Sequence, residues 1–256
     1  MSIFQAYAEY YDLLYRDKDY QKESEFIQQL IKAHAPSTQT ILELGSGTGR
    51  HAEYLAQQGY SIVGVERSED MLSHCRQRQA TQDRTLAQRL KFLQGDLRDI
   101  RLEQVFDCIL SLFHVISYQI SNADLIAAFK TVNLHLKPGG VFIFDVWYGP
   151  AVLHDKPQVR VKHLQDGNCT VTRIAKPTLH LNDNLVDVNY QILVKYPDQG
   201  TYQELQELHQ MRYLFKTEVD WLLNQAGMNL IKYGEWMTHA PAGLDTWGVY
   251  FVAAKP

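Results

Sequence analysis

Short apolar segments alternate with helix-like segments through the first 150 residues, and this alternation limits the chain to few folds. The helix-like segments carry apolar residues on one face, as in 23–34 and 123–136. Apolar segments bounded by turn residues predict five strands, at 40–44, 61–66, 90–94, 106–112 and 141–145. Strands that are apolar throughout and separated by helices indicate a parallel sheet covered by helices on both faces.

The pattern changes after Pro150. Four further strands are predicted there, at 159–164, 169–176, 185–196 and 202–213. In the third of these, Val186, Val188 and Tyr190 alternate with polar residues. Such alternation is typical of antiparallel strands with one buried face, so this region is interpreted as a meander.

The expected fold class is therefore α/β: a Rossmann-like seven-stranded mixed sheet with helices on both faces, plus an inserted antiparallel β meander. A helix capped by Thr217 and two strands, at 229–233 and 248–253, are expected to complete the sheet. We expect three parts: a ligand-binding core (1–150), an antiparallel insertion that serves the acceptor or an oligomer contact (151–215), and the last helix and strands (216–256).

Charge and cysteine content limit the possible partners. The chain has 25 basic and 29 acidic residues, so its formal net charge of -4 suggests neither nucleic acid nor a membrane surface as partner. The longest uncharged stretch, 108–123, is shorter than the roughly 20 apolar residues that a membrane span needs. Cys75, Cys108 and Cys169 are too few and too widely spaced for a disulfide framework, which favours the cytoplasm. No metal-ligand spacing occurs, and we expect no bound metal.

A glycine-rich turn follows the first predicted strand, in the pattern Glu43-x-Gly45-x-Gly47-x-Gly49. Glycines at such a turn let the backbone approach a ligand that side chains would otherwise exclude. Read from Gly47, the spacing is also one that a nicotinamide dinucleotide site accepts. The glycines alone therefore leave the cofactor open.

Acidic residues at successive strand ends favour a cofactor without phosphate. Dinucleotide sites hold a pyrophosphate at the helix N-terminus, and a carboxylate at Glu43 would repel it. S-adenosylmethionine carries a sulfonium and an ammonium group instead, which Glu43 would favour. Glu66 ends the second strand, where a carboxylate can accept both ribose hydroxyls. Asp96 follows the third strand, where a carboxylate can accept the adenine amino group.

The same residues carry a family resemblance. The glycine turn, Gly64-Val65-Glu66-x-Ser68-x-Asp70-Met71-Leu72, Gly95-Asp96 and Leu136-Lys137-Pro138-Gly139-Gly140 resemble the motif series of class I S-adenosylmethionine-dependent methyltransferases across about residues 7–146. Within that family, Tyr7-Ala8-Glu9-Tyr10-Tyr11-Asp12, Lys18-Asp19-Tyr20 and Gly95-Asp96-Leu97-Arg98-Asp99 are similar to the bacterial N,N-dimethyltransferases of nucleotide-linked deoxyaminosugars. The inserted meander also fits that group.

The resemblance implies S-adenosyl-L-methionine as cofactor, closure of Tyr11 and Tyr20 over it, and a homo-oligomer, such as a homodimer. Tyr7 and Tyr15 could equally belong to the core face of an amphipathic helix. The residues expected to bind the cofactor are Tyr11, Tyr20, Glu43, Gly45, Gly47, Gly49, Glu66, Arg67, Met71, Asp96, Leu97 and Leu112.

Methyl transfer from a sulfonium needs no acid, because the leaving thioether is neutral, and alignment lowers much of the barrier. An amine acceptor must be neutral to attack, so a nearby proton acceptor would help. The resemblance implies that the loop after the fourth strand lies beside the transferred methyl, and His114 and Tyr118 are its candidate catalytic residues. The candidate substrate-binding residues are Phe113, Trp147, Tyr148 and Arg212. His209, Trp236 and His239 could also reach the acceptor, but such residues are more often structural.

We therefore expect a small-molecule methyltransferase acting on an amine, such as an aminosugar. An O-methyltransferase or an amino-acid-type N-methyltransferase is the alternative, followed by a nicotinamide-dependent oxidoreductase and a non-catalytic cofactor-binding protein. The sequence departs from the sugar enzymes at two places. His114-Val115 replaces a Ser-Ser pair, and Trp247 stands where those enzymes carry an arginine that could contact a diphosphate. The identity of the acceptor, and whether nitrogen or oxygen is methylated, therefore stay open.

Overall fold

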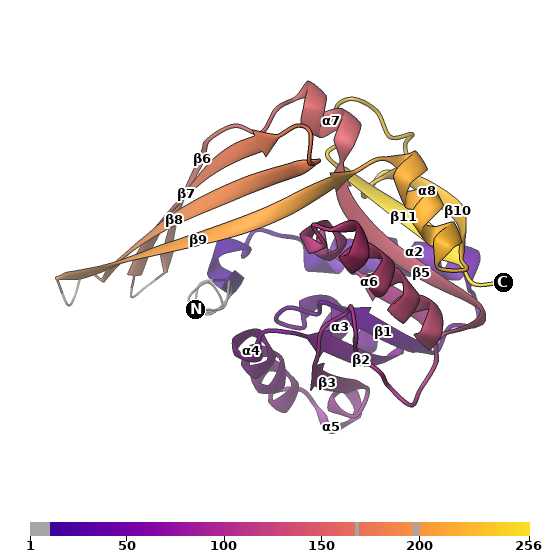
Figure 1. Cartoon of the computed structure of the whole chain (residues 1–256). Helices are drawn as coiled ribbons and strands as arrows, with labels where there is room; N and C mark the ends of the chain where they lie inside the picture. The colour runs from indigo at the N-terminus through magenta and orange to yellow at the C-terminus, as the bar shows by residue number, and fades with distance from the viewer. Residues whose placement is uncertain (1–10, 167–168, 197–199) are drawn as a thin grey trace.

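The computed structural model describes residues 11–166, 169–196 and 200–256. Within these residues, eleven strands form one sheet. The strand order is β3-β2-β1-β4-β5-β9-β8-β7-β6, and β11 and β10 extend from another part of β5 (Figure 1).

The core half of the sheet matches the expected mixed sheet. The parallel strands are β3 (Leu90–Gln94), β2 (Ser61–Glu66), β1 (Thr40–Leu44), β4 (Phe106–Ser111) and β5 (Leu136–Tyr148). β11 (Gly248–Ala254) pairs antiparallel with β5, and β10 (Asn229–Glu235) pairs antiparallel with β11. The order reverses between β1 and β4, the position at which open α/β sheets bind ligands beyond the carboxyl ends of their strands.

Helices bury both faces of this sheet. On one face, α2 (Tyr20–His34) and α3 (Arg50–Gln57) pack against residues such as Ile41 and Ile143. On the other, α6 (Asn122–His135) and α8 (Lys216–Gln225) pack against residues such as Leu42 and Phe142. The short helices α5 (Arg84–Ala87) and α7 (Gly149–His154) follow α4 (Glu69–Ala80) and β5. Of the helices in the described ranges, none has the length and apolar character needed to cross a membrane.

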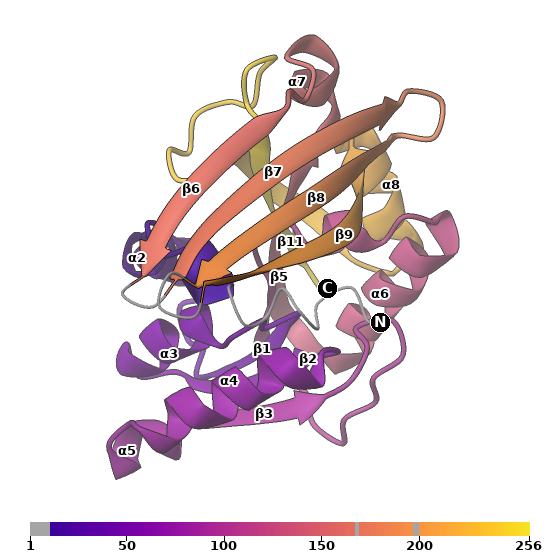
Figure 2. The ribbon, with the colours of Figure 1, turned by 90° about the vertical axis from the view of Figure 1, so that its left-hand side faces the viewer.

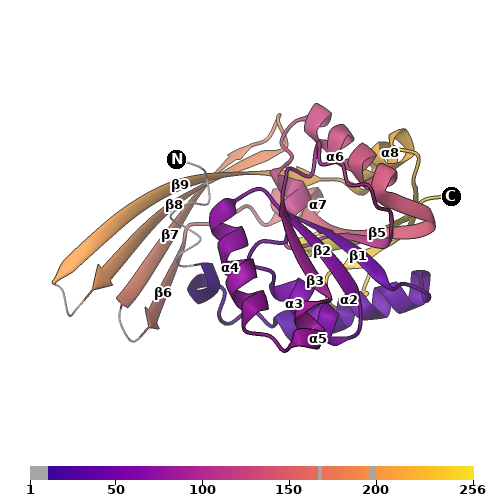
Figure 3. The same cartoon turned by 90° about the horizontal axis from the view of Figure 1, so that it is seen from below.

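The meander is a continuation of the core sheet. It consists of β6 (Arg160–Asp166), β7 (Cys169–His180), β8 (Leu185–Tyr196) and β9 (Thr201–Leu214), paired antiparallel in that order. β9 joins β5 through the parallel pairs Trp147–Tyr213 and Tyr148–Leu214, so the total number of strands exceeds the expected seven. The meander extends from the core on the side of α4 (Figures 1, 2 and 3).

Among the element boundaries that differ from the expectation, three have an identifiable cause. β5 begins at Leu136, before the expected 141, because Gly139 and Gly140 exchange backbone hydrogen bonds with Lys255 near the C-terminus. α8 is preceded by Phe215 rather than capped by Thr217, and Glu218 accepts the Phe215 N–H at 3.4 Å. α2 begins at Tyr20, before the expected 23, because the Asp19 carboxylate accepts the Lys22 N–H at 3.0 Å.

Candidate functional site

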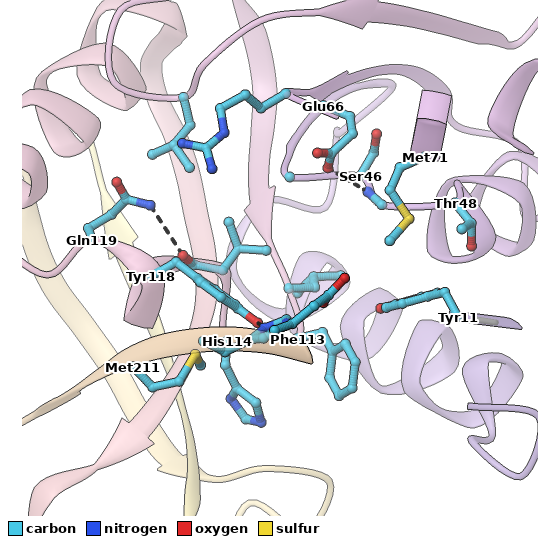
Figure 4. A pocket seen from close by; sticks show the side chains of 18 of the residues that line it. Tyr11, Ser46, Thr48, Glu66, Met71, Phe113, His114, Tyr118, Gln119 and Met211 are labelled. Atoms are coloured by element: carbon cyan, nitrogen blue, oxygen red, sulfur yellow. Dashed lines mark hydrogen bonds and ion pairs between the residues drawn. The ribbon is translucent and has the colours of Figure 1, made fainter. Parts of the chain in front are cut away.

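A cavity of about 820 Å³ lies beyond the carboxyl ends of the parallel strands and is bounded on its far side by β9. Its volume is within the range of small-molecule sites. Figure 4 shows Ser46, Glu66 and Met71 on one side of the cavity, and Phe113, Tyr118 and Met211 on the other. We call these the turn side and the β9 side.

The glycine turn supplies backbone to the turn side. Gly45, Gly47 and Gly49 all have positive φ, at 80°, 56° and 77°, a conformation that favours glycine. Gly45 and Gly47 line the cavity, and a Cβ at Gly47 would meet no protein atom within 4 Å. Gly49, expected to bind the cofactor, is absent from the lining; it caps α3 and leaves room for Phe92.

Glu66, at the end of β2, fixes the shape of the turn. One carboxylate oxygen accepts the Gly47 N–H at 3.0 Å, and the other accepts the Ser68 N–H at 2.9 Å. Ser68 in turn caps α4 by accepting the Met71 N–H at 3.3 Å. Burial raises the pKa of Glu66, although the backbone N–H groups oppose that shift. The carboxylate lines the cavity and has further acceptor capacity for ligand hydroxyls.

Glu43 does not line the cavity, contrary to the expectation that it faces the cofactor's cations. Its side chain is 2 % exposed and lies behind the turn, with one oxygen 3.9 Å from His51 Nδ1. His51 instead pairs with Glu23, at 2.8 Å. Burial, with the neighbouring Glu66 carboxylate, raises the pKa of Glu43 to about 8, so this group is mostly protonated at neutral pH.

Asp96 lies at the same side of the cavity, after β3. The Arg98 side chain donates to both carboxylate oxygens of Asp96, at 2.9 and 2.6 Å. It also donates to the Asp124 carboxylate at 2.8 Å. Arg67 lies 3.8 Å from the Asp96 carboxylate. The hydrogen bonds from Arg98 lower the pKa of Asp96, which keeps it ionised. All four of these side chains line the cavity.

The N-terminal segment covers the turn side. Asp12 accepts hydrogen bonds from the Thr48 hydroxyl at 2.9 Å and from Arg78 at 2.6 Å, which holds Tyr11 over the cavity. Tyr20, at the start of α2, also lines the cavity. Met71, Leu97 and Leu112, which were also expected to bind the cofactor, line it too. Tyr7 lies outside the described residues.

The loop after β4 is held in a strained conformation. Phe113 and His114 are consecutive non-glycine residues with positive φ, at 64° and 62°. Both oxygens of Asp145 accept the His114 N–H at 3.2 Å, and His114 Nδ1 lies 2.7 Å from the same carboxylate. Asp145 is almost fully buried at the end of β5. The pair presents Phe113 and His114 to the cavity.

A second carboxylate–histidine pair reaches the cavity from β9. The Tyr118 hydroxyl lies 2.7 Å from His209 Nδ1, and His209 Nε2 lies 3.0 Å from a Glu207 oxygen. These three residues line the cavity together with Tyr190, whose ring contacts His209 edge-on.

The expected substrate residues divide into two groups. Phe113 and Trp147 line the cavity, whereas Tyr148 and Arg212 do not. Tyr148 packs against the core under α6 and α8. Arg212 is buried and donates to Ile120, Asn122 and Glu218, so its guanidinium serves structure rather than the cavity.

Trp236 and His239 also lie elsewhere, in ring contact with Phe26. Trp247, at the position of the missing arginine, donates to Asp155 at 3.3 Å outside the cavity lining.

Sequence reasoning missed many of the lining residues. The missed residues include Tyr15, Ser46, Thr48, Arg50, His51, Arg98, Gln119, Asp124, Tyr190 and most of 204–211. Arg98 and the turn residues Ser46 and Thr48 lie within the predicted motifs, so those motifs could have indicated them. The β9 residues carry no local signal, because only the fold brings that strand over the parallel sheet.

The charge of the lining suits a cationic ligand. Five carboxylates (Glu66, Asp96, Asp124, Glu204 and Glu207) face three guanidinium groups (Arg50, Arg67 and Arg98). In the described residues, no cluster of three or more His, Cys, Asp or Glu side chains is arranged to hold a metal ion. Two histidine–carboxylate pairs beside one cavity give it the capacity to orient an acceptor and accept a proton.

Comparison with known proteins supplies the family. A family model described as a methyltransferase domain matches residues 41–140. The chain is 30% identical over 239 residues, 93% of its length and 94% of the relative's, to the dTDP-3-amino-3,4,6-trideoxy-α-D-glucopyranose N,N-dimethyltransferase of Streptomyces venezuelae. It is 29% identical to the dTDP-3-amino-3,6-dideoxy-α-D-glucopyranose N,N-dimethyltransferase of Streptomyces fradiae, over 92% of this chain and 87% of the other. The crystal structure of Streptomyces venezuelae DesVI superposes with a TM-score of 0.81 at 27% identity, covering 98% of each chain.

Proposed function

The chain belongs to the S-adenosylmethionine-dependent methyltransferases, and from this premise we propose that it methylates the amine of a small-molecule aminosugar. The main support for the proposal is the cavity, a single space that extends from the glycine turn to Glu204 and Glu207 on β9. The near full-length similarity to two aminosugar N,N-dimethyltransferases supports the choice of acceptor.

The cofactor occupies the turn side in this proposal. Glu66 accepts the ribose hydroxyls, and the backbone of Gly45 and Gly47 lies against the donor. Asp96, although engaged by Arg98, accepts the adenine amino group with its remaining capacity. The remaining contacts come from Tyr11, Tyr20, Arg67, Met71, Leu97 and Leu112, all in the lining.

The acceptor occupies the β9 side. Phe113 and Trp147 shape that side of the cavity, and His114 and Tyr118 lie beside the acceptor amine. Glu204 and Glu207 favour an acceptor that arrives as an ammonium ion. The meander, within 151–215, forms the wall that the acceptor contacts. Alignment of amine, methyl and sulfur then provides most of the catalysis.

The decisive experiment offers the purified protein labelled S-adenosylmethionine with matched acceptors. The panel contains dTDP-3-amino-3,4,6-trideoxy-α-D-glucose, the same aminosugar without nucleotide, glycine, and a catechol. Methylation of nitrogen in either aminosugar supports the proposal, and the ratio of kcat/KM for the two reports whether the nucleotide is recognised. Turnover of glycine or catechol without turnover of either sugar contradicts it.

We also propose that the enzyme works in the cytoplasm as a homodimer. The buried thiols of Cys75 and Cys108 are free, as a reducing compartment would keep them. Val161 and Leu208 on the meander are exposed apolar residues suited to a contact between copies. Light scattering during gel filtration tests the dimer, and a monomer mass across micromolar concentrations would contradict it.

A further inference from the structure

We propose that Glu207, His209 and Tyr118 form a proton relay that takes the acceptor's proton through the Tyr118 hydroxyl, with His209 as its final acceptor. The inference rests on the proposed amine methylation and adds the base for it. The three side chains form a continuous chain of contacts, 2.7 Å from Tyr118 Oη to His209 Nδ1 and 3.0 Å from His209 Nε2 to Glu207. All three line the cavity.

Chemistry fixes the direction of the hydrogen bonds. An ionised Glu207 can only accept, so His209 Nε2 carries the hydrogen and donates it. In the neutral imidazole Nδ1 is then an acceptor, and the Tyr118 hydroxyl must donate to it. A phenol oxygen can accept a hydrogen bond while its own hydrogen is donated, and a donor in the cavity, such as the N–H of a bound ammonium, can use that acceptor capacity.

Burial distinguishes this arrangement from a solvated surface pair. The side chains of His209 and Glu207 are 3 % and 7 % exposed. Water therefore competes little for the hydrogen bonds between Tyr118, His209 and Glu207. For the same reason, the Glu207 charge acts strongly on an imidazolium at His209. Burial also raises the pKa of the Tyr118 phenol, which disfavours the tyrosinate form. Tyr118 therefore gives its proton to His209 only as it receives another from the acceptor.

Several titratable groups surround the relay. Tyr190 from β8 contacts the His209 ring, and Tyr11 and Tyr15 from the N-terminal segment act electrostatically with Tyr118. Glu66, across the cavity, acts on Tyr118 as well. On the meander itself, Arg173 lies over the Tyr190 ring at 5.0 Å from its centroid. Glu207 is the carboxylate in direct contact with His209, with 3.0 Å between Glu207 Oε2 and His209 Nε2.

The proposed step conserves atoms and charge. An N–H bond of the acceptor ammonium breaks and its proton binds Tyr118 Oη, while the Tyr118 O–H bond breaks and its proton binds His209 Nδ1. The positive charge moves from the ammonium to the imidazolium beside Glu207. The freed nitrogen lone pair forms the new bond to the methyl carbon as the carbon–sulfur bond breaks. A second methylation requires the same step again, because the first product is a methylammonium, and His209 must first release its proton to solvent when the spent cofactor is exchanged.

The relay predicts a specific effect of His209→Asn. Asparagine can keep an acceptor for the Tyr118 hydroxyl, but it cannot take the proton. At pH 7, kcat on dTDP-3-amino-3,4,6-trideoxy-α-D-glucose should fall about 100-fold, a typical contribution of a positioned base. The kcat/KM of the variant should rise roughly tenfold per pH unit below the pKa of the amine, because it follows the fraction of free amine in solution, while the wild-type kcat/KM stays nearly flat. Monomethyl product should accumulate.

Two histidine variants provide the comparison. His180, on β7, pairs with Asp187 at 3.0 Å but lies outside the cavity lining, so His180→Asn should behave as wild type. His114→Asn should lower kcat without changing the shape of the pH profile. A wild-type profile and product ratio in His209→Asn, or the steep profile in His114→Asn instead, would overturn the proposal.

A readout without turnover separates this proposal from the choice of acceptor. In ¹⁵N NMR of the histidine-labelled protein at pH 7.5, His209 should be the neutral Nε2–H form, assigned by its loss in His209→Asn. Tyr118→Phe should shift its Nδ1 resonance. An imidazolium or an Nδ1–H form in the resting enzyme overturns the relay whatever the acceptor is. Failure of both aminosugars in the assay overturns only the proposed function.

Discussion

The buried Asp145 carboxylate accepts the backbone N–H of His114 with both oxygens, each at 3.2 Å, and so holds a left-handed loop against the β9 side of the cavity. Two adjacent left-handed residues cost roughly 1–2 kcal/mol each, so the loop needs an external constraint. Asp145 supplies it from the neighbouring strand β5, which makes the position of the loop at 113–114 a consequence of the sheet.

Asp145→Asn should therefore lower both the stability of the protein and its kcat. The asparagine amide keeps one acceptor oxygen for the His114 N–H. Its NH₂ group is a donor, and it replaces the second acceptor that faces the His114 backbone and ring. We expect a free energy of unfolding lower by about 1–3 kcal/mol, the cost of a poorly satisfied buried group, and kcat lower by tens-fold. Urea unfolding and steady-state kinetics measure the two effects. Asp187→Asn, which removes the His180 partner outside the cavity, is the matched control. Equal kcat losses in both variants would contradict a special role for Asp145.

Gly47→Ala should reduce cofactor affinity at modest cost in stability. The φ of Gly47 is 56°, so alanine costs about 1 kcal/mol, and no protein atom lies within 4 Å of the added Cβ. The methyl group would instead occupy space where the cofactor backbone contact is proposed. Gly139→Ala, with φ of 76° and equally open surroundings away from the cavity, carries the same backbone cost. Calorimetry should find weaker binding in Gly47→Ala alone, and equal affinities would argue against the contact.

Much of the fold follows from local sequence, because buried parallel strands are short apolar runs and helices have one apolar face. The early start of β5 and the joining of the meander to the core depend on distant partners: Gly139 pairs with Lys255, and β9 pairs with the end of β5. The same limit applies to the site. Glu66 and Asp96 are predictable because strand ends converge in a parallel sheet. Whether Arg212 faces a ligand or Glu218 depends on a packing arrangement that no local pattern specifies.

Glu66→Ala should weaken S-adenosylmethionine binding strongly. The substitution removes the proposed ribose acceptor and also frees the N–H groups of Gly47 and Ser68, which shape the turn. Hydrogen bonds to a charged group contribute roughly 1.5–3 kcal/mol each, so an affinity loss of about tenfold or more is expected in calorimetry. Glu69→Gln, at an exposed position in the same segment, is the control. Unchanged affinity in Glu66→Ala would reject the ribose assignment.

Glu43→Gln should reduce the loss of stability that the wild-type protein undergoes as the pH rises. Burial and the Glu66 carboxylate raise the folded-state pKa of Glu43 to about 8, whereas an unfolded glutamate titrates near pH 4.3. The raised value means that the folded state binds the proton more tightly. Its contribution to the free energy of unfolding is fully present below about pH 4.3 and is lost as the pH rises through about 8. The loss is about 1.4 kcal/mol for each unit of difference between the two pKa values.

Glutamine has nearly the same shape as protonated glutamate and does not titrate. Urea unfolding between pH 5 and 9 should therefore give a free energy that falls with pH in the wild type and falls less in Glu43→Gln, so that the variant becomes the more stable protein at high pH. Because Glu43 lies behind the turn, cofactor affinity at pH 7 should change far less than in Glu66→Ala. Parallel pH curves for Glu43→Gln and wild type would show that Glu43 is ionised in the folded protein, with a cation beside it.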